Sequence, residues 1–138
     1  MNVELVRKNK AFHFEASDAY HHKVQIDASP KVGGDDKGTR PMDLLLMALG
    51  GCSSIDIGLI LEKQKQKLDD FKVQITAERE DAVPSVFKKI NLHFILWGDL
   101  KEKRVIKSIE LSLDKYCSVS KILQPTAEIS YSFEIRNN

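Results

Sequence analysis

The two cysteines are the residues of this sequence whose type and setting could most directly carry out chemistry. Cys52 follows two glycines and precedes two serines, and Cys117 lies in the run Tyr-Cys-Ser-Val-Ser. A thiolate is a nucleophile, and two thiols can form a disulfide if their Cα atoms come within about 7 Å. A free cysteine is also among the most often buried residue types and packs as a small apolar side chain. The residues alone therefore leave open a reactive pair and two inert core residues.

Two amphipathic segments are predicted to be helices that carry these cysteines. The first, Thr39–Lys67, repeats apolar residues on one helical face: Leu45, Ala48, Leu49, Cys52, Ile55 and Leu59. The second, Lys101–Cys117, places Ile106, Ile109, Leu113 and Cys117 on one face. Gly50 and Gly51 each cost a helix about 1 kcal/mol relative to alanine, which predicts close approach of another backbone beside Cys52.

A reactive thiol needs a nearby cation, because a cation lowers the thiol pKa. Cys52 lies about three turns into its helix, too deep for much help from the helix dipole. Arg7, Arg40 and Arg79 are the candidate cations, and each is also consistent with a solvated surface charge. Asp56 follows Cys52 by four residues and shares its helical face, where a carboxylate would oppose thiolate formation unless an arginine lies between them.

Other classes of site lack their sequence signatures. His13, His21, His22 and His93 have no metal-ligand spacing, and two cysteines without matching histidines predict no zinc site. We find no dinucleotide-binding, phosphate-binding, nucleophile-elbow or zinc-protease motif, so we expect no cofactor. A formal net charge of +1 gives no reason to expect nucleic acid or an anionic membrane as a partner.

Length and hydropathy predict one soluble domain spanning residues 1–138. The N-terminus carries charges where a signal peptide needs an apolar stretch, and the longest apolar run, Leu-Leu-Leu-Met-Ala-Leu, is far short of the ~20 residues of a membrane span. We therefore expect a cytoplasmic protein with no membrane partner. In that compartment, cysteines are more often free, catalytic or redox-active than structural disulfides.

Alternating apolar residues predict six strands around the two helices. They are Val3–Val6, Ala11–Ala16, His22–Asp27, Phe71–Glu78, Phe87–Trp97 and Ala127–Ile135. A loop rich in glycine and aspartate, Ser29–Gly38, precedes the first helix and is expected to be mobile, and Ser118–Leu123 is a further short helical piece. The order βββ–α–ββ–α–β has no βαβ repeat, so we predict an α+β fold with antiparallel sheets.

The motifs together resemble the OsmC/Ohr superfamily, named after osmotically inducible protein C and organic hydroperoxide resistance protein. A glycine-rich loop leads into Gly-Thr-Arg-Pro, a cysteine follows Pro41 by eleven residues, and the second helix ends in Tyr-Cys-Ser-Val-Ser. The resemblance covers nearly the whole chain. It implies an intertwined homodimer in which two central helices are wrapped by sheets and the active sites lie at the subunit interface.

The same resemblance implies a thiol-dependent peroxidase for organic hydroperoxides. Cys52 matches the peroxidatic cysteine and Cys117 the resolving cysteine, with a dithiol reductant restoring both thiols. Arg7 is the nearest match to the arginine that activates the thiolate. The family glutamate that orients this arginine is replaced by Met42, and Asp43 lies one residue later, about 100° around the helix. These departures place the chain in a divergent OsmC-like branch.

Three hypotheses follow. The first is a two-cysteine peroxidase, and the second is an OsmC-like protein that binds a small ligand or senses redox state with little turnover. The third is a structural domain in which both thiols are inert. Oxidation by one equivalent of hydroperoxide distinguishes the first from the others, and alkylation of the native thiols distinguishes the third.

Overall fold

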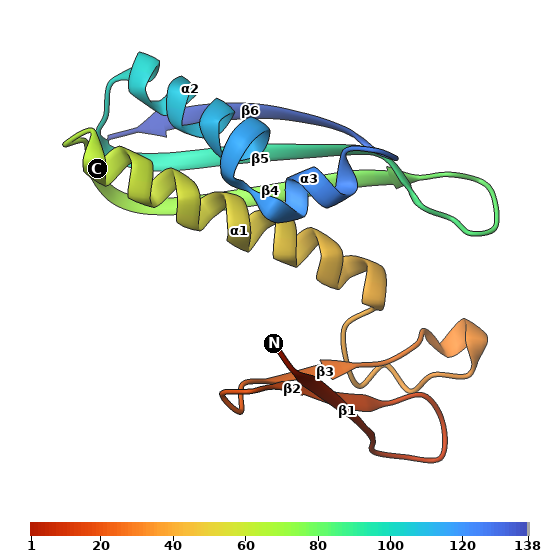
Figure 1. Ribbon diagram of the computed structural model, residues 1–138. Helices are drawn as coiled ribbons and strands as arrows, with labels where there is room; N and C mark the ends of the chain where they lie inside the picture. The colour runs from red at the N-terminus through yellow and green to blue at the C-terminus, as the bar shows by residue number, and fades with distance from the viewer. Residues whose placement is uncertain (138) are drawn as a thin grey trace. The chain divides into compact units, whose positions relative to one another are not determined.

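The computed structural model describes residues 1–137 and divides the chain into two compact units, residues 1–46 and 47–138. Helix α1 (Pro41–Lys63) begins in the first unit and continues into the second (Figure 1). The element order confirms the α+β fold class and the predicted sequence of strands and helices.

The first unit is a three-stranded antiparallel meander followed by a loop. It contains β1 (Val3–Arg7), β2 (Phe14–Asp18), β3 (Lys23–Ile26) and the short 3₁₀ helix η1 (Pro30–Val32). Asp27 is the only fully buried residue among the described residues 1–46. Phe12 and Val24 are 49% and 41% exposed, and no apolar side chain of residues 1–46 is fully buried, so this unit has no apolar core of its own.

The loop expected to be mobile is held by the carboxylate of Asp27. This carboxylate accepts backbone N–H groups from Ala28 (2.7 Å), Asp35 (3.2 Å) and Lys37 (3.0 Å). The Lys37 N–H first, and then the Ala28 and Asp35 N–H groups, lower the pKa of Asp27 against the opposing effect of desolvation. A buried anion therefore organises the loop where apolar packing is lacking.

The second unit is a three-stranded sheet with helices on one face. Strands β4 (Lys67–Arg79) and β5 (Phe87–Asp99) form the predicted antiparallel hairpin. The last strand, β6 (Glu128–Arg136), pairs with β5 in parallel, so the prediction of purely antiparallel sheets is wrong. The physical reason is the connection: α2 (Glu102–Leu111), the π-helical turn η2 (Ser112–Tyr116) and α3 (Ser118–Leu123) form a crossover between β5 and β6, as parallel neighbours require.

The core of this unit lies between the sheet and its helices (Figure 1). Central strand β5 contributes most of it, and the helices contribute the rest: Phe87, Ile90, Leu92, Phe94, Leu96, Leu49, Ile57, Leu61, Val105 and Ile109 are at most 5% exposed. Other positions of β5 and β6 carry polar side chains that are hydrogen-bonded between the two strands, such as Asn91 with Ser130 (3.0 Å) and His93 with Ser132 (2.8 Å).

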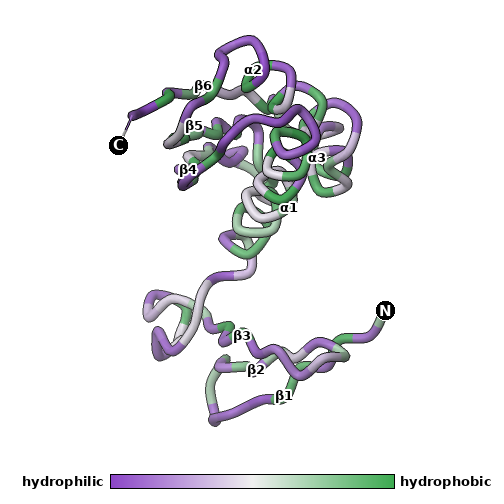
Figure 2. Tube along the Cα trace, turned by 90° about the vertical axis from the view of Figure 1, so that its left-hand side faces the viewer, coloured by the Kyte–Doolittle hydropathy of each residue, from purple (hydrophilic) through white to green (hydrophobic). Residues whose placement is uncertain are grey.

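Helix α1 is shorter than predicted and buries a different face. It ends at Lys63 and β4 begins at Lys67, earlier than expected. The buried positions are Leu49, Gly50, Ser53, Ile57 and Leu61, whereas three residues of the predicted face, Leu45, Ile55 and Leu59, are 40%, 66% and 52% exposed. Hydrophobic and neutral colours prevail along α1 in Figure 2, so periodicity alone does not select one face. Helix α1 is also long and apolar enough to cross a membrane. Core helices of soluble proteins meet the same criteria of length and composition.

The two adjacent glycines of α1 have different surroundings. A Cβ built on Gly50 would lie 2.8 Å from Cδ1 of Ile75 and 3.6 Å from Cγ1 of Val73, whereas one on Gly51 would meet nothing within 4 Å. The close approach expected here is thus made by side chains of β4 against Gly50, and not by a backbone.

Candidate active site: a thiol pair with a carboxylate

The second unit brings Cys52, Asp56 and Cys117 together. The two Sγ atoms and a carboxylate oxygen of Asp56 all lie within 4.8 Å of one another. Cys117 is 3% exposed, whereas Cys52 and Asp56 are half-buried. Both thiols are free in this structure. The site thus combines one reachable thiol, one enclosed thiol and one carboxylate.

Helix α1 supplies two of these groups through its periodicity. Cys52 and Asp56 are four residues apart, so they project from one face of the helix. Ser53 beside them is fully buried, and its hydroxyl donates to the carbonyl oxygens of Leu49 (2.8 Å) and Gly50 (3.2 Å) within the helix. A small residue whose polar atom is satisfied locally allows a second element to pack closely at this point.

The second element is η2, and its residue Ser112 contacts α1 directly. It is fully buried, and its Oγ lies 3.2 Å from Oδ2 of Asp56 and 3.3 Å from the Ser53 carbonyl oxygen. A hydroxyl has one hydrogen to donate, so these two acceptors share it. Ser112 therefore both holds η2 against α1 and orients the carboxylate beside the thiols.

The π-helical turn sets the position of Cys117. The predicted helix Lys101–Cys117 ends early: α2 stops at Leu111, and the Cys117 N–H donates to the Ser112 carbonyl five residues back (2.7 Å). Turns of this type are rare and occur frequently at functional sites. Cys117 then becomes the residue preceding α3, where its Sγ accepts the Ser120 N–H at 3.4 Å.

The enclosed thiol of Cys117 is difficult to ionise. Burial first, and then a hydrogen bond with Cys52, raise the pKa of Cys117 to about 11, and the Ser120 N–H opposes this shift. Cys117 is therefore a neutral thiol at physiological pH.

The three candidate arginines each have partners within their own unit. Arg7 donates from Nε to the Ala11 carbonyl (2.9 Å) and also to the Lys10 carbonyl. Arg40 forms an ion pair with Asp36 (2.8 Å), and Arg79 donates to the Ser85 carbonyl (2.8 Å). Assignment of the activating arginine, including Arg7, stays a prediction.

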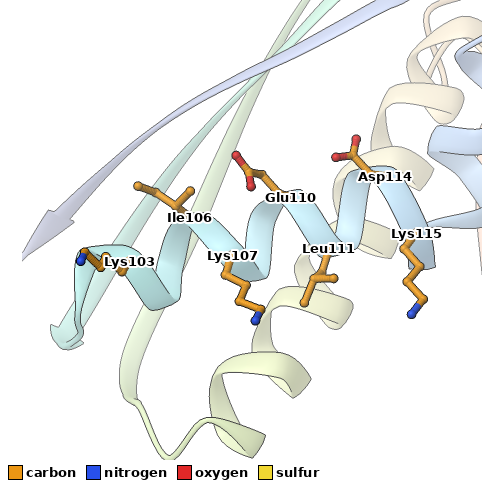
Figure 3. Close-up of a pocket in the computed structure, with 7 residues that line it drawn as sticks. All are labelled: Lys103, Ile106, Lys107, Glu110, Leu111, Asp114 and Lys115. Carbon is orange, nitrogen blue, oxygen red and sulfur yellow. The ribbon is translucent and has the colours of Figure 1, made fainter.

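Two cavities lie along the helical segment that carries Cys117. One, of about 510 Å³, is lined by Cys117 together with residues such as Tyr116, Lys121 and Ile122. The other, of about 550 Å³, follows α2 and η2 and is lined by Lys103, Ile106, Lys107, Glu110, Leu111, Asp114 and Lys115 (Figure 3). Of these two cavities, the first is lined by Cys117 but not by Cys52, and the second by neither thiol.

Sequence reasoning found both cysteines and noted Asp56, but it missed Ser53 and Ser112. A usable signal was present in the second helix, where Ser108 and Ser112 recur at helical spacing within the buried stripe. Serines in an apolar stripe indicate that another helix approaches closely.

Comparison with known proteins identifies the architecture. The family described as OsmC-like protein matches residues 34–132, a range that includes both cysteines and runs across the boundary between the two units. The chain belongs to the OsmC-like family. Among curated relatives of this OsmC-like protein, Protein YhfA of Escherichia coli K12 is 41% identical over 123 residues, covering 88% of this chain and 89% of YhfA.

Solved structures support the same assignment. A hypothetical protein from Aquifex aeolicus VF5 is 28% identical to this OsmC-like protein and superposes with a TM-score of 0.86, covering 99% of this chain and 96% of that one. A Legionella pneumophila structure described as an organic hydroperoxide resistance protein OsmC is 18% identical, with a TM-score of 0.72 and coverage of 96% and 95%. At that identity the likeness establishes the fold alone.

Proposed function

We propose that this protein is a thiol-dependent peroxidase that reduces organic hydroperoxides with Cys52 and Cys117. The observation that supports this function most strongly is the approach of the two sulfur atoms to within 4.8 Å, with one thiol reachable and the other enclosed. Membership of a family whose structural relatives include hydroperoxide resistance proteins supports the choice of substrate class.

Cys52 is the proposed peroxidatic residue because it is the more exposed of the pair. Its thiolate attacks the terminal oxygen of the hydroperoxide, the O–O bond breaks, and the alkoxide leaves and takes up a proton as alcohol. Cys52 is thereby oxidised to a sulfenic acid. The Cys117 sulfur then attacks the Cys52 sulfur, a disulfide forms, and the sulfenic hydroxyl leaves as water with the proton of Cys117.

The reductant in this scheme is a dithiol, which returns both cysteines to thiols by exchange through a mixed disulfide. Arg7 is the proposed activating cation. Its guanidinium has five N–H donors, so its contacts with the Ala11 and Lys10 carbonyls leave donors available.

We further propose a cytoplasmic homodimer in which both units of each chain form one functional domain. The first unit buries no apolar side chain within its own residues, and such a small sheet is not stable alone. The exposed apolar face of α1, with Ile55 66% and Leu59 52% exposed, provides a surface for a second copy.

The decisive experiment adds one equivalent of an organic hydroperoxide, such as cumene hydroperoxide, to the fully reduced protein and identifies the products by mass spectrometry. We expect an intramolecular Cys52–Cys117 disulfide and one equivalent of alcohol. Cys52→Ser should abolish consumption of the hydroperoxide, whereas Cys117→Ser should stop at the sulfenic acid. Undiminished consumption by Cys52→Ser would refute the proposal.

A binding or sensing protein with little turnover is the second candidate, and the position of Asp56 favours it. The carboxylate stands beside the thiols, and within residues 47–137 no Lys or Arg nitrogen lies within 4.0 Å of it. An unpaired negative charge opposes formation of the Cys52 thiolate. This function predicts an alkylatable Cys52 that leaves hydroperoxide largely unconsumed over many equivalents.

A further inference from the structure

The cluster formed by Cys52, Asp56 and Cys117 has the composition of a metal site as well as that of a redox pair. The sequence predicted no zinc site because no histidine accompanies the cysteines, but the fold supplies a carboxylate as a third ligand. The geometry points to a site for a thiophilic divalent cation of the zinc class, bound by Cys52 Sγ, Cys117 Sγ and one carboxylate oxygen of Asp56.

The distances suit such an ion. Zinc binds thiolate sulfur at about 2.3 Å and carboxylate oxygen at about 2.0–2.2 Å, so tetrahedral ligand atoms lie roughly 3.5–4 Å apart. The three ligand atoms here lie within 4.8 Å of one another. A contraction of about 1 Å or less would bring these three atoms to the spacing of tetrahedral zinc ligands.

The ligands come from elements that are already fixed. Cys52 and Asp56 occupy positions i and i+4 of α1, the spacing by which a helix presents two ligands to one ion. Cys117 follows the π-helical turn, whose Ser112 contacts α1 directly. Most of the geometry of the site is therefore formed before the ion arrives.

Two of the three ligands accept hydrogen bonds, as metal ligands in proteins commonly do. The Ser112 hydroxyl donates to Oδ2 of Asp56 at 3.2 Å, and the Ser120 N–H donates to the Cys117 sulfur at 3.4 Å. Hydrogen bonds of this kind orient ligands and stabilise their charged forms. Two thiolates and a carboxylate carry three negative charges, and a divalent cation would offset most of this charge.

The ligand set also selects the metal. Thiolates favour zinc and similar soft ions, whereas calcium and magnesium require a shell of oxygen ligands. Three protein ligands leave a fourth position for water or an external thiol. This inference does not depend on peroxidase activity, since it concerns the reduced protein without any oxidant.

The test is a titration of the fully reduced, metal-free, full-length protein with Zn²⁺, followed by competition with a chromophoric chelator. Co²⁺ is used as a second probe because thiolate coordination produces characteristic visible and ultraviolet absorption. We expect one ion per chain, sulfur-to-metal charge-transfer bands with Co²⁺, and protection of both thiols of the wild-type chain from alkylation.

Matched variants locate the site. Asp56→Asn retains the size of the ligand, and we expect it to weaken binding roughly 10- to 100-fold, the order seen when an important contact of a metal site is lost. Asp114→Asn removes a nearby exposed carboxylate outside the cluster and should bind zinc like the wild type. Cys52→Ser together with Cys117→Ser should abolish the charge-transfer bands.

Two results would overturn the inference. One is the absence of stoichiometric zinc binding and of thiol protection in the wild-type chain, a measurement that needs no variant to fold. The other is binding that persists unchanged in the double cysteine variant. Hydroperoxide consumption, measured separately on the same preparation, decides the proposed peroxidase function independently.

Discussion

The hydroxyl of Ser112 lies 3.2 Å from the Asp56 carboxylate, and this contact joins the helix that carries Cys52 to the turn that precedes Cys117. The same hydroxyl reaches the Ser53 carbonyl at 3.3 Å. One buried serine thus connects the two elements that hold the thiols, so the relative position of Cys52 and Cys117 depends on it.

Ser112→Ala tests this connection. Removal of the hydroxyl leaves the Asp56 carboxylate without its donor from η2, and loss of such a hydrogen bond to a charged group costs about 1–3 kcal/mol. We expect the free energy of unfolding in urea to fall by that amount. Ser118→Ala, at an exposed serine close to Cys117, is the matched control and should change stability little. Equal stability of the two variants would mean that the Ser112 hydroxyl contributes nothing to the packing.

The raised pKa of Cys117 predicts a specific dependence of alkylation on pH. A pKa of about 11 means that the thiol stays protonated at lower pH, and about one molecule in a thousand is a thiolate at pH 8. The rate of Cys117 labelling by iodoacetamide should therefore rise about tenfold per pH unit up to pH ~10. Mass spectrometry of the reduced, metal-free protein measures this rate.

Cys52→Ser is the control for that titration. This substitution removes the electrostatic effect of the Cys52 thiol, so the pKa of Cys117 should fall while burial still holds it above its ordinary value. A labelling rate for wild-type Cys117 that levels off near pH 9 would contradict the assignment.

Substitution of the two adjacent glycines of α1 should have unequal effects. Gly51→Ala places a Cβ in open space and should stabilise the helix by about 1 kcal/mol. Gly50→Ala gains the same propensity but brings its Cβ to 2.8 Å from Cδ1 of Ile75, so its unfolding free energy should be lower than that of Gly51→Ala.

A double variant identifies the cause. Ile75→Val removes Cδ1, so combining it with Gly50→Ala should recover part of the lost stability relative to the sum of the single changes. Additive effects would exclude this contact as the reason for Gly50. A destabilising Gly51→Ala would instead indicate that a second chain covers this exposed position.

Acid should loosen the loop that Asp27 organises. Because the pKa of Asp27 is lowered in the folded chain, its stabilising effect is complete above the ordinary value of 3.8 and is lost as the pH falls through the lower folded value. Amide exchange at Asp35 and Lys37, corrected for intrinsic rates, should show protection that declines in this range. Asp27→Asn should lack this dependence, whereas Glu4→Gln, an exposed carboxyl on β1, should retain it. The same decline in Asp27→Asn would assign the effect to another group.

The proposed dimer places the exposed face of α1 against a second copy. Ile55 is 66% exposed in the single chain, and Ile55→Glu introduces a charge that would be buried in that interface. We expect a shift from dimer to monomer in size-exclusion chromatography with light scattering. Lys63→Glu, at the exposed end of the same helix, changes charge without this effect. A monomeric wild type, or a variant that remains dimeric, would contradict this placement.

Local sequence patterns determined most of the elements of this protein. Alternation predicted the strands, the 3.6-residue period predicted both long helices, and helical spacing placed Cys52 and Asp56 on one face. These features depend on backbone geometry within a few residues, so short windows of sequence are sufficient to specify them. The two thiols were singled out from their immediate neighbours, and their roles as a pair came from the resemblance to the OsmC/Ohr superfamily.

The tertiary structure decided which apolar face of α1 is buried, that β6 runs parallel to β5, and that Cys117 meets Cys52 and Asp56. Helix α1 is apolar on more than one side, so its periodicity fits several orientations, and only packing against β4 selects one of them. The π-helical turn at Ser112 interrupts the helical period, so the position of Cys117 follows from contacts between segments more than fifty residues apart, such as Ser112 with Asp56. Such contacts have no signature in a short window, because their energy arises only when the complete chain has folded.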